Sequence, residues 1–73
     1  MKYDYGDDVV LKTEGLNGVI LKKTGTVVGI TIVENDNQVP IFGHPIGTIL
    51  YTVEFGDGSD SMIPEENVEE PFQ

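Results

Sequence analysis

The sequence predicts a single, small all-β domain, and three observations carry that prediction. Apolar side chains occupy every second position of residues 49–55, which is the period of a half-buried strand. Dipeptides that favour tight turns, Asn17-Gly18 and Asp57-Gly58, separate the apolar runs. No segment of ordinary helix length has apolar residues at helical spacing without an intervening glycine or proline.

The N-terminal third is expected to contain a lead-in, one strand and a loop. Residues 1–6 form the lead-in, and residues 7–13 form a short strand with Val9 and Leu11 on one face. Residues 14–18 form a loop that includes the Asn17-Gly18 turn. Residues 19–21 are apolar and are expected to be a short strand arm, which ends at Lys22 and Lys23.

A longer strand is expected over residues 25–33, with apolar side chains on both faces. Gly29 interrupts it, and a glycine inside a strand often marks a bulge or a tight bend. Strict alternation places on one face Val28, Ile30 and Ile32, and on the other Val27 and Val33.

The C-terminal half is expected to form a hairpin and a last short strand. Residues 34–38 are a polar turn, and residues 39–46, with two prolines, are an irregular loop. After the strand over residues 49–55, a two-residue turn at Asp57-Gly58, with positive φ at both positions, leads into a strand over residues 59–63. Pro64 ends that strand because it has no backbone donor. Residues 65–67 turn, Val68 closes the sheet, and residues 69–73 form a frayed tail.

Length and composition limit the domain count and the chemistry. The chain has 73 residues, so we expect one domain over residues 1–73, with its core over about residues 6–70. It has no cysteine and one histidine, which argues against a disulfide, a structural zinc site or a thiol nucleophile, and we expect no cofactor. No apolar run is long enough to span a membrane and the start is unlike a signal peptide, so a soluble, cytoplasmic protein is expected.

The charge is strongly acidic and unevenly distributed. Thirteen acidic residues against four lysines give a net charge of −9. The first 23 residues contain all four lysines and balance to zero, so the whole net charge lies from Thr24 onward. Such a surface repels nucleic acid and anionic lipid, and it speeds encounter with a basic protein. Solubility alone is the simpler explanation of the same charge.

Five short strands in this length are too few for an ordinary two-sheet sandwich. A strongly bent antiparallel sheet that closes on itself would cover its apolar face and remove its edges. The segments over residues 6–12, 25–30, 51–58 and 63–68 resemble the SH3-like small barrel, in the bacterial variety that includes KOW and Tudor-type modules. The resemblance implies a five-stranded barrel over most of the chain, and this barrel serves many unrelated functions.

Within that fold the chain resembles small bacterial immunity proteins of polymorphic-toxin systems, of the type called immunity protein 31. The shared features are the Tyr3-Asp4-Tyr5-Gly6-Asp7 opening, the strand over residues 25–30 and the Pro64-Glu65-Glu66 close. The resemblance implies a non-catalytic protein that binds and neutralises a toxin domain.

The sequence gives little support for a catalytic site or a metal site. His44 is the only histidine, and no nucleophile and orienting group can be assigned to it, so the protein is predicted not to be an enzyme. Residues 57–61 resemble the start of a calcium loop, but Met62 and Val68 stand where that loop needs glycine and glutamate.

Aromatic residues fall into two expected groups. Tyr51 and Phe55 are predicted to be core because of their strand alternation. Tyr3, Tyr5 and Phe72 are predicted to lie at or near the surface, where they could anchor a partner. The alternative is that the aromatic residues together build a cage for a cation or a groove for a proline-rich peptide, namely Tyr3, Tyr5, Phe42, Tyr51, Phe55 and Phe72.

Our prediction is a small acidic protein-binding module, an immunity protein whose partner is a basic toxin C-terminal domain. The alternatives are a structural or assembly module of a larger complex, acting through an exposed strand edge, and an acidic mimic of nucleic acid. The oligomeric state is left open. The residues predicted to contact the partner are Asp4, Tyr5, Glu54, Asp57, Asp60, Glu65, Glu66, Glu69 and Glu70.

Overall fold

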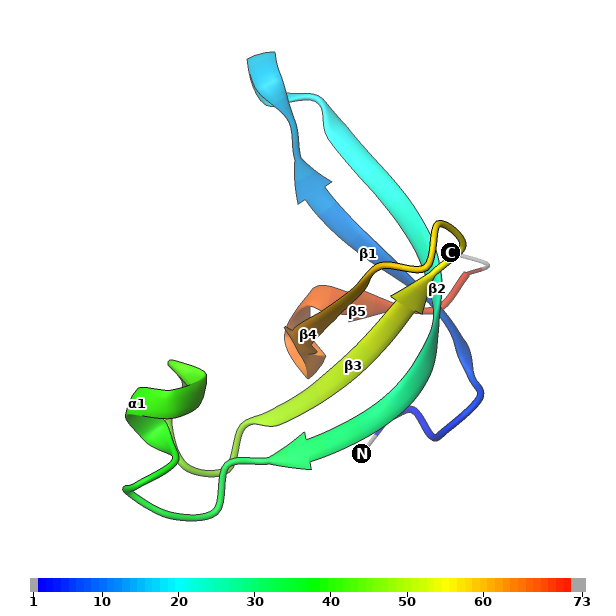
Figure 1. Cartoon of the computed structure of the whole chain (residues 1–73). Helices are drawn as coiled ribbons and strands as arrows, with labels where there is room; N and C mark the ends of the chain where they lie inside the picture. Colours follow the sequence, from blue (N-terminus) through cyan, green and yellow to red (C-terminus); the bar gives the residue numbers. More distant parts are fainter. Residues whose placement is uncertain (1, 72–73) are drawn as a thin grey trace.

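The chain forms one antiparallel sheet, which confirms the all-β prediction. The computed structural model describes residues 2–71, without the side chains of Thr13, Glu14 and Leu16. The sheet order is β4-β3-β2-β1-β5 (Figure 1). Its strands are β1 (Asp8–Glu14), β2 (Ile20–Ile32), β3 (Ile49–Phe55), β4 (Asp60–Pro64) and β5 (Val68–Glu69). The remaining elements are single turns, namely the 3₁₀ turns η1 (Leu16–Gly18) and η2 (Glu65–Asn67) and the helical turn α1 (Val39–Phe42).

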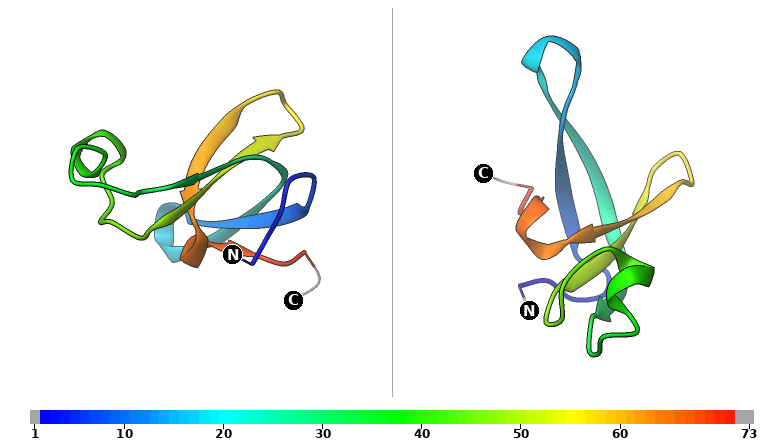
Figure 2. Two further views of the ribbon diagram at one scale, coloured as in Figure 1. Left: turned by 90° about the horizontal axis from the view of Figure 1, so that it is seen from below. Right: turned by 90° about the vertical axis from the view of Figure 1, so that its left-hand side faces the viewer.

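The sheet does not close on itself through hydrogen bonds. Strands β4 and β5 are its two edges, and the described residues show no pairing between them. The expected closed barrel is therefore not seen in the strand ladder. Figure 2 shows the hairpins β1–β2 and β3–β4 projecting from the body in different directions.

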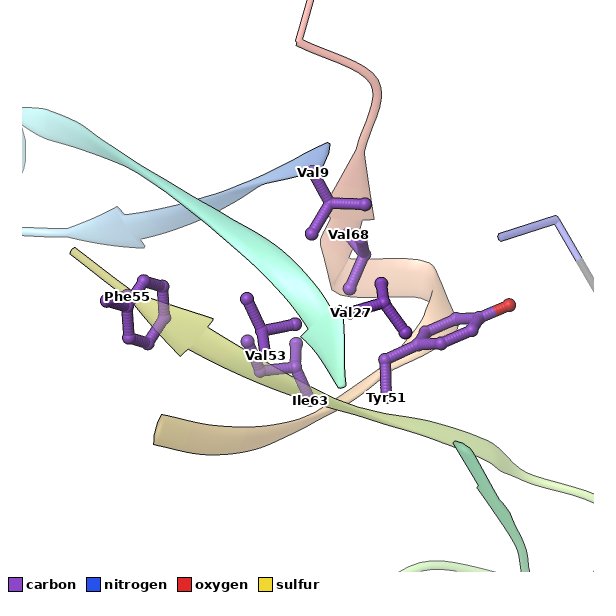
Figure 3. Close-up of a cluster of buried hydrophobic side chains, with 7 residues drawn as sticks. All are labelled: Val9, Val27, Tyr51, Val53, Phe55, Ile63 and Val68. Carbon is purple, nitrogen blue, oxygen red and sulfur yellow. The ribbon is translucent and has the colours of Figure 1, made fainter. Parts of the chain in front are cut away.

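The main core cluster lies on one face of the sheet, and all five strands contribute to it (Figure 3). Tyr51, Val53 and Phe55 alternate along β3 and are buried, as their spacing predicts. Each buried side chain of this size contributes about 1.5–3 kcal/mol relative to exposure. The cluster consists of Val9, Val27, Tyr51, Val53, Phe55, Ile63 and Val68.

A bulge in β2 confirms the expectation raised by Gly29, and it changes which residues face the core. Val27 pairs with Val53 and Gly29 pairs with Thr52, so Val28 has no partner in the ladder. One unpaired residue reverses the alternation beyond it. As a result Val27 is buried and Ile30 packs against the same cluster, whereas strict alternation placed them on opposite faces.

The turn between β3 and β4 occurs where predicted, but it has a different geometry. Gly58 has a positive φ of 85°, whereas Asp57 does not. The Phe55 N–H donates to the Ser59 carbonyl oxygen at 2.8 Å, so three residues, not two, form the loop. The Asp57 carboxylate accepts a hydrogen bond from the Ser59 N–H at 3.0 Å. This bond stabilises the turn, so a second residue with positive φ is not needed.

The two ends of the chain also depart from expectation. Tyr3 is half-buried and packs against the core, while Tyr5 is 63% exposed as predicted. Glu69 pairs with Val10 and belongs to β5. Phe72 and the end of the expected frayed tail lie outside the described residues.

The connection between β2 and β3 contains the helical turn α1 in place of a wholly irregular loop. Its ends are joined by backbone bonds, from the Val33 N–H to the Thr48 oxygen at 3.0 Å and from the Gly47 N–H to the Val33 oxygen at 2.7 Å. Within residues 2–71, no helix is long and apolar enough to cross a membrane.

Close packing at Gly25 gives a test of the core. A methyl group there would meet the Val53 side chain and the Glu54 carbonyl oxygen, the latter at 2.8 Å. We expect Gly25→Ala to destabilise the protein by about 1–3 kcal/mol, measured as the urea unfolding free energy by circular dichroism. Gly56→Ala is the control, because a methyl group there has no neighbour within 4 Å. Equal stability of the two variants would contradict this packing.

Candidate protein-binding surface

A row of acidic side chains crosses the sheet on the face opposite the core. Asp8 pairs with Thr26, Thr26 pairs with Glu54, and Glu54 pairs with Asp60. Directly paired residues of neighbouring strands share one face, so all four side chains lie on the same side. Glu54 lies between the buried residues Val53 and Phe55 and therefore points away from the core. We call Asp8, Glu54 and Asp60 the acidic row.

The acidic row is expected to lower the stability of the isolated protein. Glu54 and Asp60 are directly paired on neighbouring antiparallel strands, so their Cβ atoms are roughly 5 Å apart and their like charges repel. Asp8 lies further along the row, on the other side of Thr26. All three carboxylates are exposed, and the structure describes no ion pair for any of them. Asp8 accepts one hydrogen bond from the Thr26 hydroxyl at 3.2 Å. A cationic partner would relieve this repulsion.

Asp8 was missed in the sequence analysis, whereas Glu54 and Asp60 were among the predicted contact residues. The pattern could have placed Asp8 on the outer face, since it precedes the core residue Val9. Its alignment with Glu54 across Thr26 depends on strand register, which the local pattern does not determine.

Glu65 was also predicted to contact a partner, but its carboxylate already binds groups of the protein itself. It accepts hydrogen bonds from the Tyr51 hydroxyl and from the Lys2 N–H, the latter at 3.1 Å. These bonds, that from Tyr51 first, lower the pKa of Glu65. The Tyr51 oxygen in turn accepts from the backbone N–H groups of Lys2 and Tyr3, each at 3.2 Å. Burial raises the pKa of Tyr51.

Two further predicted residues are paired with lysines. Glu69 forms an ion pair with Lys12 at 3.0 Å. Asp57 lies 3.8 Å from Lys23, and its pKa is lowered chiefly by its hydrogen bonds from Ser59.

The other four predicted residues lie at exposed positions. The Asp4 carboxylate accepts the Tyr5 N–H at 2.8 Å, in a turn next to the N-terminus. Tyr5 is itself exposed. Glu66 and Glu70 are exposed, and the structure describes no ion pair for either.

A pocket of about 350 Å³ lies beside η2. Pro45, Ile49 and Pro64 give it apolar walls, and Glu65 and Glu66 place carboxylates at its rim. His44 also lines it, and the structure describes no hydrogen bond from its ring that would orient it as a base. An apolar wall with a carboxylate at its edge suits the stem and head group of a lysine or arginine side chain.

Within residues 2–71, no three His, Asp or Glu side chains come close enough to hold a metal ion. Comparison of the chain with protein families, with curated proteins and with solved structures finds no match. The functional argument therefore depends on the surface itself.

Protonation of Glu65 should destabilise the fold. A carboxylate whose pKa is lower in the folded protein than in the unfolded chain stabilises the fold. The full contribution is present at pH values above the ordinary pKa of 4.5, and it is lost as the pH falls through the lowered pKa of the folded protein. Between about pH 6 and pH 3, we expect the unfolding free energy to fall less steeply in Glu65→Gln than in the wild type. Glu66→Gln removes the same charge from a residue outside the hydrogen-bond network of Glu65, so this variant should keep the wild-type slope. Identical slopes for the two variants would refute the assignment.

Removal of one charge from the acidic row should stabilise the free protein. We expect Asp60→Asn to raise the unfolding free energy by roughly 0.2–1 kcal/mol at low salt, and the gain should shrink as salt screens the repulsion. Asp36→Asn, an exposed loop position with the same charge change, is the control. The measurement is urea unfolding at two salt concentrations. A gain as large in the control would mean that net charge alone is responsible.

Proposed function

We propose that this protein is a non-catalytic acidic module that binds a basic protein. From the resemblance described above, we further propose that the partner is a toxin domain, which the module neutralises as an immunity protein. The acidic row is the observation that carries the proposal. Three carboxylates, of which Glu54 and Asp60 are directly paired, are expected to lower stability in the free protein, and they would be favourable against a cationic surface.

The net charge of −9 supports the same partner chemistry. Complementary charge speeds association and orients the encounter, while like charge disfavours nucleic acids and acidic proteins. A toxin that binds nucleic acid needs a basic surface for its own substrate. An acidic module that occupies that surface would block the substrate without any chemistry of its own.

The pocket beside η2 offers a second anchoring point, at the start of β3, whereas Glu54 lies near the end of that strand. A lysine or arginine of the partner could place its aliphatic stem against Pro45 and Ile49 and its charge near Glu66. Anchors of this kind contribute a large share of the binding energy in protein interfaces. Glu65 is less available, because its carboxylate holds Tyr51 and Lys2.

Affinity capture with matched charge reversals tests the proposal. We expect the tagged protein to retain one basic protein from a lysate of its source at low salt and to release it at high salt. The double variant Glu54→Lys/Asp60→Lys should weaken binding at least about tenfold. The control Glu34→Lys/Asp36→Lys makes the same charge change at exposed positions of the β2–β3 connection and should bind as the wild type does.

Co-expression distinguishes the immunity function from simple binding. The captured domain should arrest growth when it is expressed alone, and the wild-type module should restore growth. The Glu54→Lys/Asp60→Lys variant should restore it poorly. A harmless partner would instead favour an assembly module, and equal binding by both double variants would refute the role of the acidic row.

A further inference from the structure

The β1–β2 hairpin extends beyond the rest of the sheet. Strand β1 pairs with β2 along its whole length, from Asp8 opposite Thr26 to Glu14 opposite Ile20. In contrast, β3 pairs with β2 only from Gly25 onward, and β5 pairs with β1 only at Val10 and Leu11. Residues 12–24 thus form a two-stranded ribbon, which we call the arm, and Figures 1 and 2 show it projecting from the body.

The arm leaves one edge of β2 without a partner. The described residues show no strand and no other backbone hydrogen bond on the side of Ile20–Thr24 away from β1. A free edge of this kind is a template for an added strand. Proteins block such edges with proline, bulges or charge. The bulge of β2 lies beyond this stretch, at Val28, so lysines are the only blocking residues in it.

The arm also exposes an apolar patch at its end. Val19, Ile20 and Leu21 are consecutive, and each is more than half exposed. Single exposed apolar residues are ordinary, but three together at the end of a projecting ribbon form a patch that water solvates poorly. A strand added here would cover them.

Charge identifies the kind of strand that fits. Lys12 and Lys22 face each other directly across the ribbon, which is unfavourable unless negative charge lies nearby. Glu69 forms an ion pair with Lys12 and Asp57 lies 3.8 Å from Lys23, whereas Lys22 is exposed and the structure describes no ion pair for it. Lys22 is therefore the cation of the arm that an added strand of opposite charge would meet.

We propose that the arm docks an extended segment of another protein, rich in acidic and apolar residues, which adds as a strand along Ile20–Thr24. This site is independent of the proposed function, because it lies on a different part of the sheet and selects the opposite charge. A second arm is a poor occupant, because like lysines would meet. An anionic membrane is also a poor occupant, because it would repel the nine acidic residues from Thr24 onward.

Peptide binding to the full chain tests the proposal. The probe is a fluorescein-labelled peptide of alternating valine and glutamate, and the control peptide alternates valine and lysine. By fluorescence anisotropy we expect the glutamate peptide to bind at least about tenfold more tightly than the lysine peptide. Amide chemical shifts in ¹⁵N spectra should change chiefly at residues 19–24, because an added strand bonds to the backbone there.

Matched variants separate the contribution of charge from that of apolar contact. Lys22→Glu should weaken glutamate-peptide binding at least about fivefold, whereas Lys2→Glu makes the same charge change outside the arm and should not. Leu21→Ser should weaken binding similarly. Ile41→Ser is its control, since Ile41 is 74% exposed in α1, at the end of the molecule far from the arm (Figure 1).

Four results would overturn the proposal. The first is no binding of the glutamate peptide at about 1 mM protein, and the second is binding that Lys22→Glu leaves unchanged. The third is self-association in analytical ultracentrifugation that Leu21→Ser abolishes, which would assign the arm to a second copy. The fourth is co-sedimentation with phosphatidylserine vesicles that Leu21→Ser abolishes, which would assign it to a membrane.

Discussion

The burial of the Tyr51 hydroxyl group is the constraint on which the rest of the structure depends. The ring lies within the core cluster, and its hydroxyl points away from the other six side chains (Figure 3). A buried phenol oxygen without partners would cost about 1–3 kcal/mol. Its partners come from the backbone of Lys2 and Tyr3 and from the Glu65 side chain. One polar atom therefore joins the N-terminal segment and η2 to the middle of the sheet.

This arrangement matters because the sheet stays open between β4 and β5. Tyr3 packs edge-on against Tyr51, with ring centres 5.5 Å apart, and its hydroxyl donates to the Val68 oxygen at 3.2 Å. The N-terminal segment thus links β3 to β5 through side chains where strand pairing is lacking. Because the chain has no cysteine, these hydrogen bonds and contacts connect the parts of the fold that a disulfide often connects in small domains.

The uneven charge of the sequence becomes two separate surfaces in the fold. Carboxylates of β1, β3 and β4 align in the acidic row, and lysines gather along the arm. Each group contains unfavourable like-charge neighbours, Glu54 with Asp60 and Lys12 with Lys22. Neither arrangement helps the isolated protein to fold. Both would become more favourable against a partner of opposite charge, and this is why we propose different partners for the two surfaces.

The sequence by itself determined the all-β class, the strand over residues 49–55, the turn positions, the core roles of Tyr51 and Phe55, and the acidity of the C-terminal two thirds. All of these depend on local periodicity or on composition. Only the tertiary structure decided the open sheet, the face of Ile30 beyond the bulge, the burial of Tyr3, the internal role of Glu65 and the alignment of Asp8 with Glu54 and Asp60. These depend on strand register and on contacts between residues far apart in the chain, which local patterns do not specify.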